Sequence, residues 1–188
     1  MARAGLDTDA VVAAAAQLAD ADGLEAVTLA RLAAILGVRS PSLYAHVDGL
    51  ADLRRRLAAR GARELAATLQ RAVAGRSRSD ALFAMADAYR AYARAHPGTY
   101  AALQRAPARG DAEGAGAAAD VVDVVLAVLR GYGLAGEDAI HATRIIRAAL
   151  HGFVTLETEG GFGLPLALDD SYVRLVDLLD RGLSAPRA

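Results

Sequence analysis

The sequence contains no cysteine, no tryptophan and no lysine among its 188 residues. The lack of cysteine excludes disulfide bonds and thiol chemistry. Because lysine is missing, arginine carries all of the formal positive charge, and 21 basic residues face 22 acidic ones for a net charge of −1. This balance excludes a basic protein that coats nucleic acid. A reader of nucleic acid with this charge must keep its positive side chains in one place.

Targeting and membrane segments are also missing from the sequence. The N-terminus has no charged stretch followed by an apolar one, which is the pattern of a secretory signal. Asp120 and Asp123 interrupt the most apolar run, so that run does not match a membrane span. We therefore expect an intracellular protein that works in the cytoplasm.

The usual catalytic motifs are missing as well. The chain has no Gly-x-Ser-x-Gly elbow, no phosphate-binding glycine loop and no His-Glu-x-x-His. The strongest catalytic spacing is Glu137 with His141, one helical turn apart and beside Asp138. A metal ion would need at least a third ligand there. We expect no enzyme activity, no bound metal and no cofactor.

What the chain does have is alanine and other apolar residues, which favour helices. Hydrophobic residues make up 54% of the sequence, and alanine has the highest helix propensity. A strand is predicted by an alternating run of β-branched residues bounded by turns, and the sequence has no such run. The sequence predicts an all-α protein of about nine helices, with a three-helix unit at residues 1–48. A long helix then leads into a second helical part at 49–188.

The stretch from Thr28 to Val47 has the pattern of a helix-turn-helix. Thr28 is a good N-cap, and Gly37 accepts the left-handed conformation that ends a helix. Ser40 is predicted to cap a second short helix that runs to His46, with Pro41 at its first position. A helix, a glycine turn and a second helix with a polar face describe this motif. The same pattern also fits an ordinary pair of packed helices.

The residues of this stretch resemble the DNA-binding end of the TetR family of transcriptional regulators. That family's recognition helix typically runs Leu-Tyr-x-His-Phe or Leu-Tyr-x-His-Val, and positions 43–47 are Leu-Tyr-Ala-His-Val. The resemblance covers roughly the first fifty residues. It implies a ligand-responsive regulator, most often a repressor. Residues 1–48 would then be its helix-turn-helix DNA-binding domain, and residues 49–188 its helical regulatory and dimerisation domain. Many members place a lysine at the start of the next helix to contact a phosphate, whereas this chain has Leu50 there. Backbone amides or Arg54 and Arg55 would have to replace it.

The resemblance implies double-stranded DNA as the partner, with the recognition helix in the major groove. Ser42 and Tyr44 are expected to contact base edges or phosphates, and Arg39 lies at the turn. His46 either touches a phosphate or packs beneath the helix. An N-terminal arm carrying Arg3 either reaches the DNA or stays disordered. The predicted DNA-binding residues are Thr28, Arg39, Ser40, Pro41, Ser42, Tyr44, His46 and Arg54.

A long helix is predicted from Asp48, with an apolar stripe along its length. Five arginines lie near its start. They either form a solvated face or interact electrostatically with DNA phosphates. They are Arg54, Arg55, Arg56, Arg60 and Arg63. A helix shared in this way would couple the DNA-binding end to the rest of the chain.

Two long helices near the C-terminus, at about 137–159 and 170–183, carry more apolar surface than one core needs. Such a surplus usually marks a partner, so we expect a homodimer and an inverted-repeat operator. The predicted dimer residues are Leu150, Val154, Val173, Val176 and Leu183.

A small, largely apolar effector is expected to bind among the aromatic side chains of the second part. Taken one at a time, aromatic side chains of this kind more often fill the hydrophobic core than line a ligand pocket. The predicted ligand-binding residues are Phe83, Tyr89, Tyr92, Tyr100, Leu103, His141, Arg144 and Phe153.

The C-terminal part is also similar to a TetR subgroup that carries a Trp-His-Gly signature. Leu150, His151 and Gly152 occupy that signature here, so its tryptophan is missing. The other hypothesis is an all-helical adaptor or binding protein without DNA activity. That hypothesis explains the helices and a dimer face, but it leaves the helix-turn-helix pattern unexplained.

Overall fold

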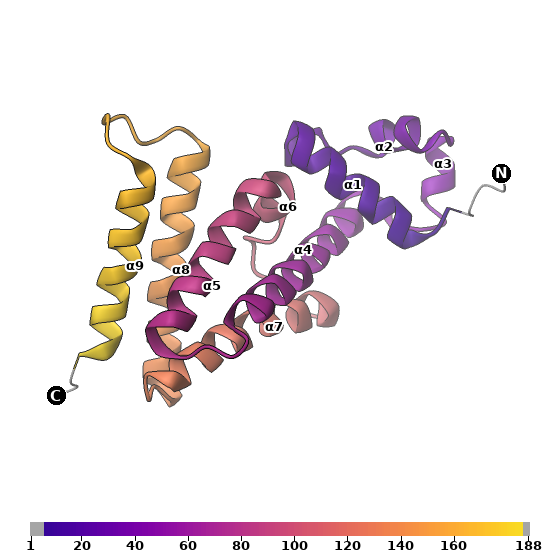
Figure 1. Cartoon of the computed structure of the whole chain (residues 1–188). Helices are drawn as coiled ribbons and strands as arrows, with labels where there is room; N and C mark the ends of the chain where they lie inside the picture. Colours follow the sequence, from indigo (N-terminus) through magenta and orange to yellow (C-terminus); the bar gives the residue numbers. More distant parts are fainter. Residues whose placement is uncertain (1–5, 186–188) are drawn as a thin grey trace. The chain divides into compact units, whose positions relative to one another are not determined.

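A computed structural model describes residues 6–185, and within this range every regular element is a helix (Figure 1). The nine α-helices and one 3-10 helix, η1, confirm the prediction of an all-α fold. None of these helices is both long and apolar enough to cross a membrane. Their bounds are α1 Thr8–Asp22, η1 Leu24–Ala26, α2 Leu29–Leu36, α3 Ser40–Leu43, α4 Gly49–Val73, α5 Arg78–Ala95, α6 Pro97–Ala102, α7 Ala112–Gly131, α8 Gly136–Thr158 and α9 Leu168–Ser184.

The chain forms two compact units. Unit 1 takes the chain up to Glu64 together with Ala95–Ala118, and unit 2 takes Leu65–Arg94 together with the chain from Ala119 onward. This division differs from the boundary expected after residue 48. The reason is that Leu53 and Leu57, on the first turns of α4, are fully buried in the core of unit 1.

The core of unit 1 gathers one apolar stripe from each of its first helices. Val11 and Ala15 of α1 meet Leu32 of α2, and all three side chains are fully buried. Leu43 of α3 lies in the same cluster, as does Ala102 at the end of α6. The helix-turn-helix pair is therefore held from behind by α1, α4 and α6 together.

A close contact fixes α6 to α1 within unit 1. A Cβ on Gly98 would lie 2.0 Å from the Ala19 carbonyl oxygen, so only glycine lets the two backbones approach this closely. The Asp20 carboxylate accepts the Thr99 amide at 2.7 Å and pairs with the His96 ring at 3.0 Å. The start of α6 is thus tied to α1 by backbone packing and by a shared carboxylate.

Unit 2 contains α8 and α9, which lie side by side (Figure 1). The buried Tyr172 hydroxyl donates to the Ala86 carbonyl at 2.5 Å, linking α9 to α5. Arg90 donates two hydrogen bonds to Glu157, with its Nε at 2.8 Å, and its guanidinium lies 4.7 Å from the Tyr172 ring centroid. This cluster anchors α5, α8 and α9 to one another.

Candidate nucleic-acid interface

The first helix of the candidate DNA-binding pair begins and ends where the sequence predicts. The Thr28 hydroxyl accepts the Arg31 amide at 3.3 Å, so Thr28 is the N-cap of α2. Gly37 has φ 66°, in the left-handed region, and the Val38 amide donates to the Ala33 carbonyl at 3.0 Å. Local chemistry at these positions sets the turn between α2 and α3.

The second helix is shorter than the sequence predicts. Helix α3 ends at Leu43, and the residues up to His46 form tight turns. The Tyr44 amide donates to the Pro41 carbonyl at 3.3 Å, and the His46 amide donates to Leu43 at 2.9 Å. These bonds span three residues rather than four, so the backbone leaves the α-helical path. The predicted Ser40 cap is also wrong, because Arg39 is the N-cap residue and no side chain caps the helix.

The segment from α3 to Val47 has one face exposed to solvent and the other buried in the core of unit 1. Leu43 is fully buried and Val47 is 2% exposed, whereas the Tyr44 side chain is 61% exposed. His46 is half-buried, and its carbonyl accepts from the Thr8 hydroxyl at 3.2 Å. Four predicted contact residues are exposed around Tyr44, and Ser40 is half-buried. The exposed four are Thr28, Arg39, Pro41 and Ser42.

The arginine cluster at the start of α4 is engaged in ion pairs with acidic side chains of unit 1. Arg54 meets Glu25 at 3.1 Å, and Arg63 meets Glu113 at 3.1 Å. The sequence analysis expected either a solvated face or contact with DNA phosphates, and it did not predict ion pairs within the chain. Most of the acidic partners lie far from these arginines along the chain. The remaining pairs are Arg55 with Asp52, Asp111 and Glu113, Arg56 with Asp52, and Arg60 with Glu64.

Arg39 is different from these arginines. It is exposed, and over residues 6–185 no ion pair is found for it. Arg3, which was expected to form part of an arm, lies outside the described residues. Arg39 therefore supplies an accessible positive charge at the start of α3.

Asp52 is the centre of the ion-pair network, and the sequence analysis did not identify it. Its carboxylate accepts from Arg55 at 2.5 Å, from Arg56 at 2.9 Å and from the Asp48 amide at 3.1 Å. Burial alone would raise its pKa, but the hydrogen bonds from Arg56, Arg55 and Asp48 lower the pKa to about 2. The spacing of three and four residues to the two arginines was the signal available in the sequence.

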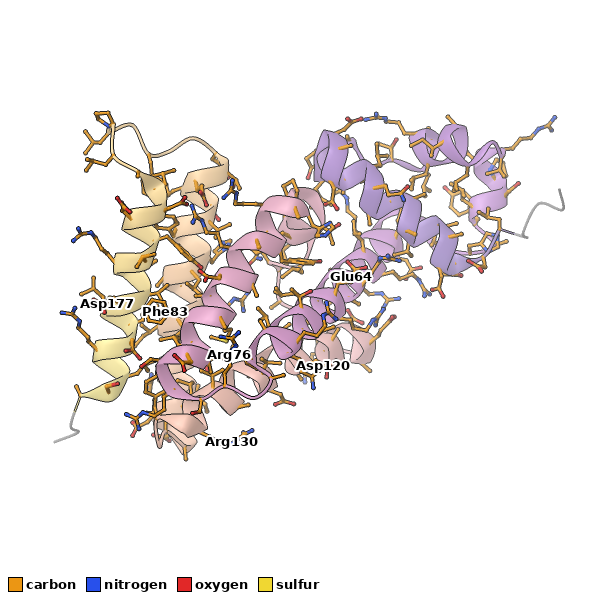
Figure 2. All side chains as sticks on the ribbon, in the orientation of Figure 1. Glu64, Arg76, Phe83, Asp120, Arg130 and Asp177 are labelled. Atoms are coloured by element: carbon orange, nitrogen blue, oxygen red, sulfur yellow. The ribbon has the colours of Figure 1, made fainter. Side chains whose placement is uncertain are left out.

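The predicted ligand-binding residues are divided between the two units. Tyr100 and Leu103 belong to unit 1, and the other six belong to unit 2. Phe83, labelled in Figure 2, is half-buried on α5. Phe153 packs 5.0 Å from the ring centroids of both Phe162 and Tyr172. Of the other four in unit 2, two are buried and two are exposed. The buried pair is Tyr89 and Tyr92, and the exposed pair is His141 and Arg144.

Unit 1 contains a cavity of about 530 Å³. It lies among η1, the first turns of α4, the end of α6, the following loop and the start of α7. Leu103 is the one predicted ligand-binding residue on its wall. In unit 2, a groove of about 430 Å³ between α8 and α9 is lined by His141. The predicted set is therefore not gathered around either space.

The predicted dimer residues need a correction. Leu150, Val154 and Val176 are at most 2% exposed within the single chain, because they fill the core between α8, α9 and the rest of unit 2. Val173 is 54% exposed and keeps a surface to offer, and Leu183 is half-buried. The apolar side chains that do reach the surface of these helices are Ile140, Ile145, Leu156, Val173 and Leu178.

Comparison with known proteins gives one family. A model described as "Tetracyclin repressor-like, C-terminal domain" matches residues 82–179. An uncharacterized HTH-type transcriptional regulator of Mycobacterium tuberculosis is 45% identical over 162 residues, which are 84% of this chain and 72% of the relative. These matches are to transcriptional regulators and not to enzymes, as the sequence analysis expected.

Solved structures share the fold. A protein of unknown function from Rhodococcus sp. RHA1 is 25% identical with a TM-score of 0.81, covering 97% of this chain and 98% of that one. A TetR variant from Acinetobacter baumannii AYE in complex with minocycline is 22% identical with a TM-score of 0.71, covering 95% and 96%. These likenesses, together with the family match, do not address the Trp-His-Gly subgroup.

Proposed function

Because this chain belongs to the TetR family of helix-turn-helix transcriptional regulators, we propose that it is a repressor that binds an inverted-repeat operator as a homodimer and leaves it when a small molecule binds. A regulator of this kind acts in the cytoplasm, beside the DNA. The residues proposed to contact DNA are Thr28, Arg39, Ser40, Pro41, Ser42, Tyr44, His46 and Arg54.

The observation that carries this proposal is the orientation of α3 and the turn after it. Leu43 and Val47 are buried, so they fix the segment against the core of unit 1. Tyr44 is 61% exposed at the end of α3, and Arg39 is exposed at its start. A largely exposed aromatic ring and an exposed cation on one short segment suit a DNA backbone and its groove.

The proposed dimer uses the exposed apolar side chains of α8 and α9. Ile145 is 59% exposed and Leu178 is 67% exposed, and both line the groove between these helices. A two-fold axis would place this patch against its own copy and remove the groove from water. A Leu178→Glu change should then give a monomer in sedimentation at micromolar concentration. A dimer that persists in this variant would contradict the proposed interface.

Release by an effector is supported by the solved TetR variant that contains minocycline. A ligand that binds one conformation of the dimer better than another shifts the population by that difference in affinity. Helix α4 contributes residues to both units, so it is one covalent route by which such a shift reaches α2 and α3.

The test begins with selection of an operator from random DNA by the purified full chain. Arg39→Ala and Tyr44→Ala should each weaken binding to the selected operator by about 1–3 kcal/mol. Arg174→Ala is the matched control, because it removes an exposed arginine of unit 2. If the α3 variants bind like the wild type, the proposed interface is wrong.

Salt provides a second readout of the same contacts. Each phosphate neutralised by a cation adds about 0.9 to the slope of log affinity against log salt concentration. A symmetric dimer has two copies of Arg39, so Arg39→Ala should reduce this slope by about 1.8 if the guanidinium contacts a phosphate. An unchanged slope with weakened binding would instead assign Arg39 to a base edge.

A further inference from the structure

The cavity in unit 1 has an apolar wall of small aliphatic side chains. None of the 18 residues that line it is aromatic, although the chain has nine tyrosine and phenylalanine residues. Such a wall offers no ring for stacking and suits a flexible aliphatic body. Eleven of the lining residues are apolar, and eight of these are alanine.

The charged residues on the same wall differ in how well they are paired with opposite charges. Asp52 and Asp111 are 11% and 7% exposed, and both are already bound by Arg55. Among residues 6–185, Arg54 is paired only with Glu25, whose side chain is 86% exposed, and the Arg54 Nε is buried without a hydrogen-bond partner. Since an exposed ion pair contributes little, Arg54 can exchange Glu25 for another anion.

A second cation lies on the loop between α6 and α7. Arg105 lines the cavity and is exposed, and no ion pair is found for it in the described part of the chain. The acidic groups of the wall are therefore engaged, while two cationic side chains still have free donors. The wall carries three acidic and three basic side chains, but the exposed Glu25 can turn out to water. Without Glu25, two acids face three cations, and the cavity then needs one negative charge.

The geometry points to this cavity as the site of an aliphatic monocarboxylate, bound head-on by Arg54 and Arg105, whose arrival releases DNA. The inference rests on the proposed repressor function and gives the class and site of the effector. It differs from the site expected among the aromatic side chains of the second part of the chain.

Release follows from the residues that the ligand would displace. A carboxylate at Arg54 takes the place of Glu25, which belongs to η1. Leu24, from the same short helix, also lines the cavity. Helix η1 leads directly to the Thr28 cap of α2, so movement of η1 changes the placement of the DNA-binding pair.

Direct binding of a defined probe tests the site without DNA. Decanoate, with octanoate and tetradecanoate to bracket its length, is titrated calorimetrically into the full chain, and uncharged decan-1-ol serves as the head-group control. Arg54→Gln or Arg105→Gln should weaken decanoate binding about tenfold or more, because a charge-assisted hydrogen bond is lost. Binding of decan-1-ol should not change. Arg109→Gln, on the same loop but off the cavity wall, should bind decanoate like the wild type.

Filling the cavity gives an independent test. Ala58→Phe and Ala106→Phe both place a ring in the cavity, and Ala106 is exposed, so that variant keeps the test open if Ala58→Phe does not fold. Both should abolish decanoate binding. Ala115→Phe is the matched control, because Ala115 is exposed on α7 and does not line the cavity.

DNA release is then measured with the selected operator. Decanoate should weaken operator binding by the wild type and by Arg109→Gln, but not by Arg105→Gln or Ala106→Phe, which should bind the operator normally without the probe. If decanoate does not bind the wild type, the assigned site is wrong while operator binding still stands. If decanoate binds and operator affinity is unchanged, the effector role is wrong. If no operator is selected at all, the repressor function fails, and the role in DNA release fails with it, whatever the calorimetry gives.

Discussion

Replacing Asp52 by Asn should destabilise the protein through a loss of charge at the centre of the ion-pair network. Asp52 holds Arg55 and Arg56 at 2.5 and 2.9 Å and is itself 11% exposed. The amide oxygen of Asn keeps an acceptor for the Asp48 backbone, which donates at 3.1 Å in the wild type. The substitution therefore removes the charge while it preserves size and the helix-start hydrogen bond.

The size of the effect follows from the pKa of Asp52. Burial opposes ionisation, but the hydrogen bonds from Arg56, Arg55 and Asp48 lower the pKa from 3.8 to about 2. At about 1.36 kcal/mol per pKa unit, this shift corresponds to roughly 2.4 kcal/mol of stability. Arg55 and Arg56 are 34% and 32% exposed, so solvent screening reduces the expected value to about 1–2 kcal/mol.

The pH dependence has a definite sign. Since the folded-state pKa lies below the unfolded value, the stabilisation is fully present above pH 3.8 and is lost as pH falls towards 2. Wild type should thus exceed Asp52→Asn in urea unfolding at pH 7, and the gap should close between about pH 4 and pH 2. Asp123→Asn, at an exposed site on α7, is the control and should match the wild type. Equal stabilities at pH 7, or a gap that persists at pH 2, would refute the reasoning.

Three further substitutions test the packing and charge arrangement, each by urea unfolding at pH 7. Gly98→Ala should cost about 1–3 kcal/mol or prevent folding, because its Cβ meets the backbone of α1 at 2.0 Å, whereas Gly116→Ala, with open space around it, should not destabilise. Gly37→Ala should cost about 1 kcal/mol because φ is 66° there. Arg90→Gln should cost about 2–4 kcal/mol, since it leaves the Glu157 carboxylate, 11% exposed, without its ion-pair partner. The loss should be smaller in mild acid, because Arg90 is the main cause of the lowered pKa of Glu157.

Local chemistry was sufficient to predict the helices and most of the helix-turn-helix. The Thr28 cap and the Gly37 stop depend on residues within one turn of chain, so the sequence determines them directly. The end of α3 was not predictable in the same way. Leu43 and Val47 fit a continued helix equally well, so the apolar spacing does not predict the three-residue hydrogen bonds at Tyr44 and His46.

Long-range contacts could not be read from the pattern. Arg54 and Arg63 meet acids 29 and 50 residues away, so no local window distinguishes a DNA-facing arginine from one engaged within the chain. Likewise, α8 and α9 have more apolar side chains than one core can bury, but the sequence does not indicate which of them are buried. Leu150 and Val176 went to the core, and Ile145 and Leu178 stayed exposed.

The composition of unit 1 sets the order in which a newly made chain can fold. Its segments are separated by residues 65–94, and Gly98 and Ala102 complete the packing behind α1 and α4. After Glu64 has been synthesised, the ribosome must add 54 more residues before the chain reaches Ala118, the last residue of unit 1. At about 5–20 residues per second this takes roughly 3–11 s, during which the apolar backs of α1 and α4 lack their cover. A nascent chain of this regulator thus exposes an incomplete DNA-binding unit to the cell, and a fragment cut at residue 48 lacks both α4 and α6 permanently.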